Sequence, residues 1–466
     1  MASSGAPALP QHVHLIGIGG AGLSAIARVL AMRGHRVTGS DLRSSPITQA
    51  LGALGIATYE GHAAEHVDGA ELVVVSSAVP EDNPEVVAAR AAGLPVLRRQ
   101  ELMPRLMAGH KGVAVAGTHG KTTTTGMLAY ILERAGCSPT YIVGGVLSDL
   151  GTNASVGTGP HFVIEADEYD GMFLGLRPHV AIVTNVEMDH PDCYQDLNAL
   201  CVAFGRFLDG VLPDGAIIAC SDCVALAQLV AQQRSNRAPA VTYGLKAGND
   251  YRAVDAQPVP DGGMRFRVVR GAETWGTFHL VLPGIHNVLN ATAALVAAER
   301  LGVERRVAGE ALATFRGALR HFEVKGERGG ITIVDDYAHH PTEIRATLAA
   351  ARGRYDGRRI WAVWEPHTYS RIAALLDEFG ACFGDADQVI VTDVYAARSH
   401  ERAIIHPETV VASIDHPNVH HVGGREQVVA YLLDRLESGD VLLTLGAGDG
   451  YRIGEDVLAR LAREAM

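Results

Sequence analysis

A glycine-rich turn around one of the few lysines is the sharpest chemical signal in this sequence. Gly117-Thr-His-Gly-Lys-Thr122 follows a β-rich run at 111–117 and opens a helical run, and only four of the 40 Lys and Arg residues are lysines. The amides of such a turn and the Lys121 ammonium can surround the β- and γ-phosphates of a nucleotide, while the Thr122 hydroxyl can reach Mg²⁺. The turn is shorter than the usual G-x-x-x-x-G-K-[ST] pattern because residue 115 is Val. The predicted phosphate loop comprises Gly117, Thr118, His119, Gly120, Lys121, Thr122 and Thr123.

Acidic residues follow two further β-rich runs. The run at 161–165 ends in Glu165, and the run at 178–186 precedes an acidic segment that contains His190. The carboxyl ends of parallel strands line the ligand crevice of an open α/β sheet, so Glu165 is predicted to bind Mg²⁺ together with Thr122. On spacing alone, His190 is either a metal ligand or an ordinary loop histidine. We expect three nearby acids to be solvated loop residues: Glu168, Asp170 and Asp192.

A second glycine turn lies near the start of the chain. Gly17-Ile-Gly-Gly-Ala-Gly22 fits G-x-G-x-x-G between a predicted strand and a predicted helix, and Asp41 stands at the end of the next strand. The amides of such a turn can approach a diphosphate, and Asp41 can accept a hydrogen bond from a ribose hydroxyl. By itself this pattern predicts a nucleotide diphosphate better than it predicts NAD.

Strands and helices alternate along the whole chain, which favours a three-domain α/β protein. The length of 466 residues, at about 150 residues per domain, also gives three domains. The segment between about 250 and 283 instead shows short alternating strands separated by turns, which we predict to be an antiparallel addition to the middle domain. The predicted domain ranges are 1–108, 109–321 and 322–466.

The composition excludes several classes of function. The formal net charge of −12 argues against a surface for nucleic acid or an anionic membrane, because such a surface would be basic. No run of 18 apolar residues is present, so we expect no membrane span. The six cysteines are scattered and the chain begins without a leader pattern, so we expect a cytoplasmic protein without a disulfide framework.

Taken together, the motifs resemble those of the Mur ligases of peptidoglycan synthesis. In chain order they are GIGGAG, GTHGKTTTT, EADE, TNVEMDH, GIHNVLNA, DDYAHHPTEI and EPHTYSR, and they cover essentially the whole sequence. The resemblance is greatest to the branch that joins L-alanine to UDP-N-acetylmuramate. It implies an N-terminal Rossmann-like domain for the UDP-sugar, a central P-loop ATPase-like parallel sheet, and a C-terminal Rossmann-like domain for the amino acid. It also implies that ATP, with Mg²⁺, converts the muramoyl carboxylate to an acyl phosphate that the amine attacks.

The resemblance assigns roles to residues in all three domains. Lys121, His190 and Arg371 are the implied catalytic residues, and Thr122, Glu165 and His190 are the implied metal ligands. Outside the phosphate loop, the residues implied to contact ATP are Asn287, Asn290, Arg320 and Asp336. Those implied to contact the UDP-sugar or the amino acid are Gly19, Gly20, Gly22, Ser40, Asp41, Ser76, Tyr337, His339 and Arg371. Arg371 also has a physical rationale, because a guanidinium can grip the carboxylate of a free amino acid with two hydrogen bonds.

Three other interpretations remain open from the sequence. Tyr169-Asp170 after EADE resembles the related ligase that recycles a tripeptide onto the same UDP-sugar. The turn at Gly17–Gly22 with Asp41 also fits an NAD-dependent oxidoreductase, although that activity would not need the residues at 117–125. A non-catalytic nucleotide-binding regulator would not need the His, Tyr and Arg set of the third domain.

Overall fold

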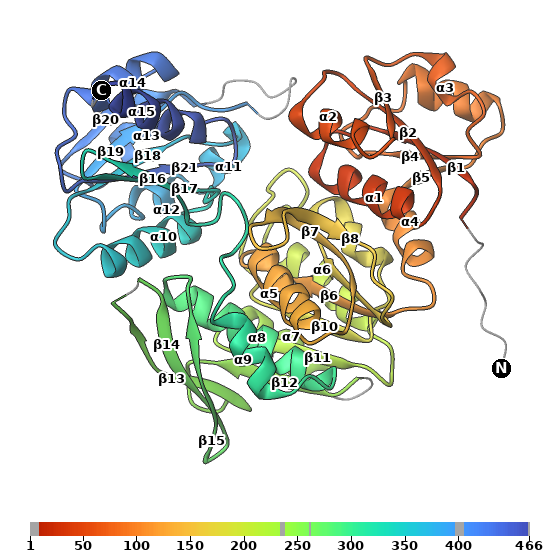
Figure 1. The fold of residues 1–466 in the computed structure, drawn as a ribbon, viewed down its shortest axis with the longest axis horizontal. Helices are drawn as coiled ribbons and strands as arrows, with labels where there is room; N and C mark the ends of the chain where they lie inside the picture. The colour runs from red at the N-terminus through yellow and green to blue at the C-terminus, as the bar shows by residue number, and fades with distance from the viewer. Residues whose placement is uncertain (1–8, 234–237, 261, 397–404, 465–466) are drawn as a thin grey trace. The chain divides into compact units, whose positions relative to one another are not determined.

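The computed structural model describes residues 9–233, 238–260, 262–396 and 405–464. The start of the chain, where we expect no leader segment, lies outside these ranges. Figure 1 shows the helices and strands of the chain. The chain divides into two compact units. The first comprises residues 1–186, 198–250 and 293–311, and the second comprises 187–197, 251–292 and 312–466. Three α/β domains with mainly parallel sheets are distributed over these units, as predicted.

The N-terminal sheet is fully parallel and has the strand order β3-β2-β1-β4-β5. Its central strands β1 and β4 are buried along their whole length, because helices cover both faces of such a sheet. The strands are β1 (His12–Ile16), β2 (Arg36–Asp41), β3 (Ala57–Glu60), β4 (Leu72–Val75) and β5 (Val96–Arg98). The helices are α1 (Ala21–Met32), α2 (Pro46–Gly52), the 3₁₀ turn η1 (Ala64–Val67), α3 (Pro84–Ala91) and α4 (Arg99–Leu106).

The central domain contributes a larger, mixed sheet to the first unit. In this unit the order is β12-β11-β10-β6-β9-β7-β8, parallel except for the β7–β8 pair. The strands are β6 (Lys111–Ala116), β7 (Thr140–Leu147), β8 (Thr152–Ser155), β9 (His161–Glu165), β10 (Val180–Val183), β11 (Ala216–Cys220) and β12 (Ala240–Gly244). The helices of the central domain are α5 (Lys121–Arg134), the 3₁₀ segment η2 (Tyr169–Gly175), α6 (Leu197–Asp209), α7 (Val224–Gln233), α8 (Ile285–Arg300) and α9 (Arg305–Leu312). Residues 285–292 of α8 belong to the second unit.

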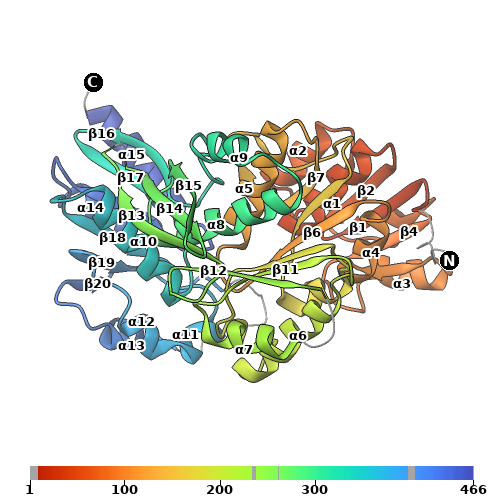
Figure 2. The same ribbon diagram turned by 90° about the horizontal axis from the view of Figure 1, so that it is seen from below.

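The two sheets of the first unit are joined through helix contacts. Helix α1, which follows the N-terminal glycine turn, packs against β7 and β8 of the central sheet. Figure 2 shows α1 beside β7. Helix α4 likewise packs against η2, the segment that follows the acidic end of β9. These contacts place the N-terminal glycine turn and the central phosphate loop in one compact body.

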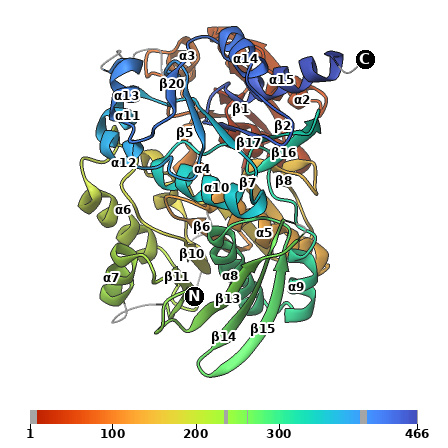
Figure 3. The same ribbon diagram turned by 90° about the vertical axis from the view of Figure 1, so that its left-hand side faces the viewer.

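The second unit contains an antiparallel ribbon and the C-terminal sheet. The ribbon is formed by β13 (Tyr251–Pro258), β14 (Met264–Arg270) and β15 (Glu273–Leu280), as predicted for residues 250–283 (Figure 3). The C-terminal sheet has the order β16-β17-β21-β18-β19-β20, with only the β16–β17 pair antiparallel. Its strands are β16 (Glu323–Arg328), β17 (Ile331–Asp336), β18 (Ile360–Trp364), β19 (Gln388–Val391), β20 (Val419–His421) and β21 (Val441–Leu445).

Two apolar clusters cover the two faces of the C-terminal sheet. Helices α10, α11, α12 and α13 contribute to the cluster on one face, and α14 and α15 contribute to the other. The helices that follow the adjacent strands β17 and β21 lie on opposite faces of the sheet. The carboxyl ends of such a strand pair are where α/β proteins bind ligands. The helices are α10 (Pro341–Arg354), α11 (Tyr369–Ala374), α12 (Leu376–Gly380), α13 (Pro407–Ser413), α14 (Arg425–Leu433) and α15 (Tyr451–Glu464). Among the described residues, no helix combines the length and the apolar character needed to cross a membrane.

Candidate active site

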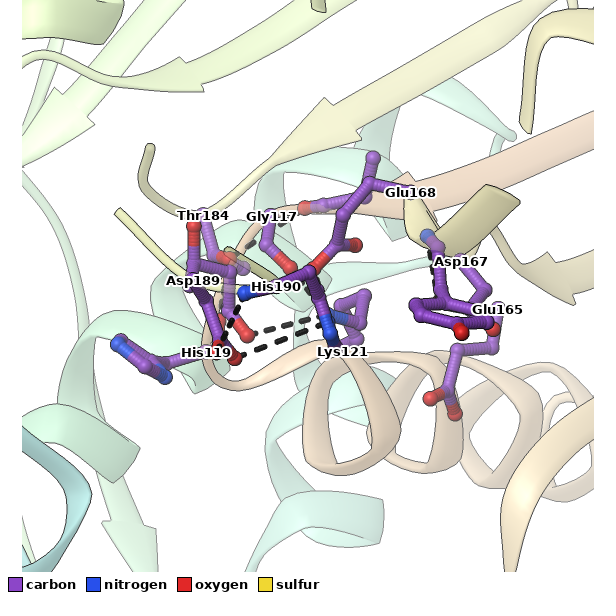
Figure 4. A network of polar contacts seen from close by, with 12 residues as sticks. Gly117, His119, Lys121, Glu165, Asp167, Glu168, Thr184, Asp189 and His190 are labelled. Atoms are coloured by element: carbon purple, nitrogen blue, oxygen red, sulfur yellow. Dashed lines mark hydrogen bonds and ion pairs between the residues drawn. The ribbon is translucent and has the colours of Figure 1, made fainter. Parts of the chain in front are cut away.

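The phosphate loop lies between β6 and the start of α5, where the sequence predicted it (Figure 4). Gly117 has a φ of +134°, and a Cβ there would come within 2.0 Å of Thr184 Oγ1, so no other residue fits this turn without rearrangement. Gly120 takes the left-handed conformation that precedes the first residue of α5, Lys121. The loop therefore ends at the N-terminus of α5, the positive end of its helix dipole, which suits an anion.

Lys121 is held inside the loop by three oxygens. Its Nζ donates to the carbonyls of Gly117 and Thr118 at 2.6 and 3.0 Å and to Glu168 Oε1 at 2.9 Å. Burial opposes the charged form, but the nearby carboxylates of Glu168 and Asp167 raise the pKa of Lys121 above its ordinary value. Lys121 is therefore a fixed cation at the mouth of the loop.

Glu168 is not the solvated residue that the sequence suggested. Its side chain is only 1% exposed and forms the ion pair with Lys121. The prediction failed because the partner of Glu168 lies 47 residues away in the chain. Asp170 and Asp192 are exposed, as predicted.

Glu165 and Thr122 provide adjacent oxygen ligands beside the loop. Thr122 Oγ1 donates to Glu165 Oε1 at 3.0 Å, and the Gly144 amide donates to Glu165 Oε2 at 2.6 Å. Burial raises the pKa of Glu165, although Lys121 opposes this effect. A carboxylate next to a hydroxyl is the kind of oxygen donor set that Mg²⁺ prefers, and a divalent cation would offset the cost of partly burying the charge.

Two residues that the sequence analysis did not single out hold the loop in shape. Asn185 Oδ1 accepts from the His119 amide at 2.9 Å, and Asn185 Nδ2 donates to the His119 carbonyl at 3.1 Å. Thr184 Oγ1 donates to the same carbonyl at 2.5 Å. Both residues follow β10, which pairs with β6. Both could have been identified from the expectation that ligand-binding residues follow the carboxyl ends of parallel strands, since they directly precede the acidic segment selected on that ground.

The N-terminal glycine turn is closed by Asp41. Asp41 Oδ2 accepts from the Gly19 amide at 2.8 Å, while Gly20 precedes the first residue of α1. Ser76 follows β4, and its Cβ lies 2.9 Å from the position that a Gly17 Cβ would occupy. The predicted UDP-sugar residues Gly19, Gly20, Asp41 and Ser76 thus lie around one turn.

Arg99 is a further cation at this turn that the sequence analysis missed. A Cβ on Gly22 would lie 2.1 Å from Arg99 Nη1, so the guanidinium lies directly on the turn. Arg99 Nη2 also lies 3.3 Å from Asp167 Oδ2, beside the phosphate loop. Arg99 therefore lies between the two glycine-rich loops of the first unit, and its place at the end of β5 was the available signal.

A line of buried polar side chains crosses the N-terminal sheet. His12 Nδ1 lies 2.7 Å from the Gly69 carbonyl, and His12 Nε2 lies 3.0 Å from Thr38 Oγ1. His14 Nδ1 lies 2.8 Å from the same hydroxyl, and His14 Nε2 lies 3.0 Å from Glu85 Oε2. This line of contacts connects the Gly69 carbonyl, through His12, Thr38 and His14, to the buried Glu85 carboxylate.

Glu85 collects further donors and is 0% exposed. It accepts from Ser40 Oγ at 2.6 Å and lies 2.9 Å from His66 Nδ1. Burial opposes ionisation, but the hydrogen bonds from His14, Ser40 and His66 lower the pKa of Glu85 to about 2. The Ser40 hydroxyl, predicted to contact the UDP-sugar, is thus buried and donates to Glu85.

Replacing Glu85 by Gln is expected to weaken the N-terminal sheet most at neutral pH. The folded-state pKa of about 2 lies below the ordinary 4.5, so the carboxylate stabilises the fold above pH 4.5 and this contribution is lost as the pH falls toward 2. The shift corresponds to roughly 3 kcal/mol. Hydrogen exchange should show that the amides of β1 are much less protected in Glu85→Gln than in the parent protein at pH 7. This difference in protection should be smaller at pH 3. The control is Glu60→Gln, at an exposed position. An equal loss of protection in Glu85→Gln at both pH values would contradict an ionised Glu85.

The second unit gathers the predicted third-domain residues at the carboxyl end of β17. Asp336 accepts from the amides of Phe322 and Ala338, both at 2.8 Å, and burial raises the pKa of Asp336 to about 7. Tyr337 follows directly and is 38% exposed. Its ring meets that of His339 edge to face, with centroids 5.3 Å apart. Burial lowers the pKa of His339 to about 4, so this imidazole is neutral at physiological pH.

Arg320 is tied to the same strand ends. Its Nε donates to Asp335 Oδ2 at 3.0 Å, and its Nη2 donates to the Gly446 carbonyl after β21 at 2.7 Å. The guanidinium also lies over the rings of Tyr337 and Tyr451, at 5.2 and 4.5 Å from their centroids. Arg320 thus joins the ends of β17 and β21.

Asn287 and Asn290 are buried on successive turns of α8. Asn290 Nδ2 donates to Asn287 Oδ1 at 3.2 Å, and Asn287 Nδ2 donates to the Pro283 carbonyl at 2.7 Å. The structure therefore brings these two predicted nucleotide contacts together within the second unit.

Arg371 on α11 forms a buried ion pair with Asp189. Arg371 Nε donates to Asp189 Oδ1 at 2.8 Å, and Arg371 Nη2 donates to Asp189 Oδ2 at 3.3 Å. Burial opposes ionisation, but Arg371 and then His190 keep the pKa of Asp189 well below its ordinary value. His190 Nε2 lies 3.7 Å from Asp189 Oδ2, and His190 has a φ of +54°. The sequence analysis did not give Asp189 a role, although it is the neighbour of His190.

Three family models match consecutive parts of the chain. They are described as Mur ligase family, catalytic domain (residues 12–111), Mur ligase middle domain (115–298) and Mur ligase, glutamate ligase domain (320–448). These matches span the two glycine-rich loops and the third-domain cluster. The chain belongs to the Mur ligase family.

Individual relatives are similar over nearly the full length. The chain is 45% identical to the UDP-N-acetylmuramate-L-alanine ligase of Desulfosudis oleivorans, covering 96% of this chain and 98% of that protein. It is also 45% identical to the enzyme of the same name from Rubrobacter xylanophilus, covering 96% and 100%. The solved UDP-N-acetylmuramate-alanine ligase of Thermotoga maritima is 28% identical with a TM-score of 0.82, covering 97% and 99%. A murein peptide ligase from Psychrobacter arcticus is also 28% identical over the same shares, with a TM-score of 0.73.

Proposed function

We propose that this protein joins L-alanine to the muramoyl carboxylate of UDP-N-acetylmuramate at the expense of ATP. The observation that carries the proposal is a phosphate loop with a fixed Lys121 cation, in a chain 45% identical over nearly its whole length to ligases named for this reaction. The oxidoreductase interpretation leaves this loop unexplained. Membership of the family also explains the third domain, which a nucleotide-binding regulator would not need.

The reaction needs two bond exchanges. A muramoyl carboxylate oxygen attacks the γ-phosphorus of ATP, ADP leaves, and an acyl phosphate forms. The amine of L-alanine then attacks the acyl carbon, loses a proton, and inorganic phosphate leaves from the tetrahedral intermediate. Phosphorylation is required because a free carboxylate has no acceptable leaving group, and the protein contributes mainly positioning and charge compensation.

In this proposal the first unit supplies the charge compensation. Lys121 and the loop amides neutralise the transferring phosphoryl group. Thr122 and Glu165 would hold one Mg²⁺, which when bound neutralises phosphate oxygens as a Lewis acid. His190, which belongs to the second unit, is assigned to a second Mg²⁺. Arg99 is suited to neutralise an anionic part of the UDP-sugar, because it lies on the N-terminal glycine turn and also pairs with Asp167, beside the phosphate loop.

The second unit would recognise the amino acid and part of the nucleotide. We assign Arg371, with Tyr337 and His339, to L-alanine, and Asn287, Asn290, Arg320 and Asp336 to ATP. In this proposal, the domain at 1–108 binds the UDP-sugar, the domain at 109–321 binds ATP, and the domain at 322–466 binds the amino acid. All six cysteines are free, which fits a reaction in the reducing cytoplasm.

The related tripeptide-recycling activity is the alternative that a single experiment can exclude. A free alanine carries its carboxylate one carbon from the amine, whereas the terminal carboxylate of a tripeptide lies several residues away from it. Phosphate release from ATP should therefore depend on UDP-N-acetylmuramate and be fastest with L-alanine, slower with L-serine or glycine, and absent with an L-Ala-γ-D-Glu-diamino-acid tripeptide. Faster phosphate release with the tripeptide would instead support the tripeptide-recycling activity, which Tyr169-Asp170 resembles.

A further inference from the structure

The guanidinium of Arg371 is already held along one of its two hydrogen-bonding edges. Nε and Nη2 form the side-on edge, and both donate to the carboxylate of Asp189, at 2.8 and 3.3 Å. Arg371 and Asp189 are 5% and 4% exposed, so solvent competes little for this pair. The third nitrogen, Nη1, lies 3.3 Å from His367 Nδ1.

These contacts leave a second edge of Arg371 for a ligand. A guanidinium has five N–H groups, and the three contacts from the described residues use one on each nitrogen. One N–H therefore remains on Nη1 and one on Nη2. With His367 on the outer N–H of Nη1, these two groups point the same way, and a carboxylate can bind this terminal pair with two parallel hydrogen bonds when the plane of the guanidinium is fixed.

The carboxylate of Asp189 is itself fixed by its surroundings. The His190 amide donates to Asp189 Oδ1 at 2.7 Å. The preceding residue, Met188, contacts His340 Nε2 through its carbonyl at 3.1 Å. Thr342 Oγ1 donates to Glu187 Oε1 at 2.6 Å, so the segment is held at the start of α10 as well. All these contacts lie within the second unit.

We propose that Asp189 is a positioning residue that orients Arg371 for the carboxylate of the amino-acid substrate. The Asp189 carboxylate holds the side-on edge, and the terminal edge receives the substrate carboxylate. Asp189 thereby acts as a specificity determinant, since it makes the enzyme favour amines that carry an adjacent carboxylate. This inference rests on the proposed function.

The competing interpretation is that the Asp189 carboxylate occupies the position on Arg371 that the substrate carboxylate would take. The Asp189 carboxylate would then have to leave Arg371 before an amino acid could bind. The geometry favours positioning, because a rotation of Asp189 away from Arg371 would also break its contact with the His190 amide and leave a charge buried without its partner. The two interpretations predict opposite changes in the KM for alanine.

The test compares L-alanine with L-alaninamide, which keeps the amine and lacks the carboxylate. In Asp189→Asn the KM for L-alanine should rise at least tenfold, while the KM values for L-alaninamide, ATP and UDP-N-acetylmuramate stay within about twofold. The matched control is Asp434→Asn, which removes the carboxylate from an exposed pair with Arg435 at 2.8 Å and should leave all these values unchanged. Asp189→Glu keeps the charge but displaces the guanidinium by one methylene, so its KM for alanine should lie between the parent and Asp189→Asn.

Three results would overturn the inference. A lower KM for alanine in Asp189→Asn would show that Asp189 competes with the substrate. An equal loss with both amines would show that Asp189 only supports the fold, and the unfolding midpoint would then fall as well. If Asp189→Asn does not fold, Asp189→Glu is tested in its place. An unchanged ratio of the KM for L-alanine to the KM for L-alaninamide in Asp189→Glu would also contradict the inference. Failure of the parent enzyme to release phosphate with L-alanine would instead refute the proposed function.

Discussion

Replacing Lys121 by Ala is expected to abolish ligation while UDP-N-acetylmuramate still binds. Lys121 is the cation that the loop holds on Gly117, Thr118 and Glu168, and no other lysine of the described chain lies in this loop. Losing a positioned cation at a transferring phosphoryl group should lower the rate on the order of 10³-fold or more. Phosphate release with saturating L-alanine measures the rate, and calorimetric titration with the UDP-sugar measures binding.

A matched lysine variant separates this effect from a general loss of charge. Lys246 is exposed, and its Nζ donates only to the Asp222 carbonyl among the described partners, at 3.0 Å. We expect Lys246→Ala to retain the parent rate within about twofold. Turnover of Lys121→Ala within tenfold of the parent would refute the assignment of the phosphate loop. Loss of UDP-sugar binding in Lys121→Ala would show instead that the variant disturbs the whole first unit.

Replacing Arg371 by Lys is expected to raise the KM for L-alanine about 30-fold with a smaller change in kcat. A lysine ammonium can still pair with Asp189 in the buried site, but it cannot also present two parallel N–H groups to a second carboxylate. The loss of that contact corresponds to about 2 kcal/mol. Initial rates at varied alanine, with ATP and the UDP-sugar saturating, give both constants.

The control for Arg371→Lys is a surface arginine that also pairs with an aspartate. Arg435 is 44% exposed and pairs with Asp434 at 2.8 Å, and Arg435→Lys should leave the KM for alanine unchanged. An unchanged KM in Arg371→Lys would place the amino-acid carboxylate elsewhere. Tyr337 and His339 at the end of β17 would then be the next residues to vary.

The parts of the site that the sequence predicted are those built from neighbouring residues. Both glycine turns lie between a strand and the helix that follows it, so their positions are set by local backbone requirements. Glu165 was predicted because it ends a buried strand. The main strands were also recognisable as apolar runs, whereas the hairpin of β7 and β8 was not, since its polar and glycine-containing stretches lack a clear period.

The errors and omissions concern contacts between residues far apart in the chain. Glu168 was predicted to be solvated, but the fold buries it against Lys121. Asn185 supports the loop at His119 from 66 residues away, and Arg99 reaches the N-terminal turn at Gly22 from the end of β5. Each follows a strand, but nothing in the local sequence shows which distant residue it contacts.

By itself, the sequence determined the order of the three α/β domains, the two anion-binding turns and the family, because these depend on short segments whose spacing is preserved in the folded chain. Only the tertiary structure decided which charges meet. Asp189 and Arg371 are separated by 182 residues, and their pairing depends on how α11 packs beside the segment at 187–189. Burial then makes such a pair strong and specific, since each charge is costly without the other, and no local sequence pattern encodes that requirement.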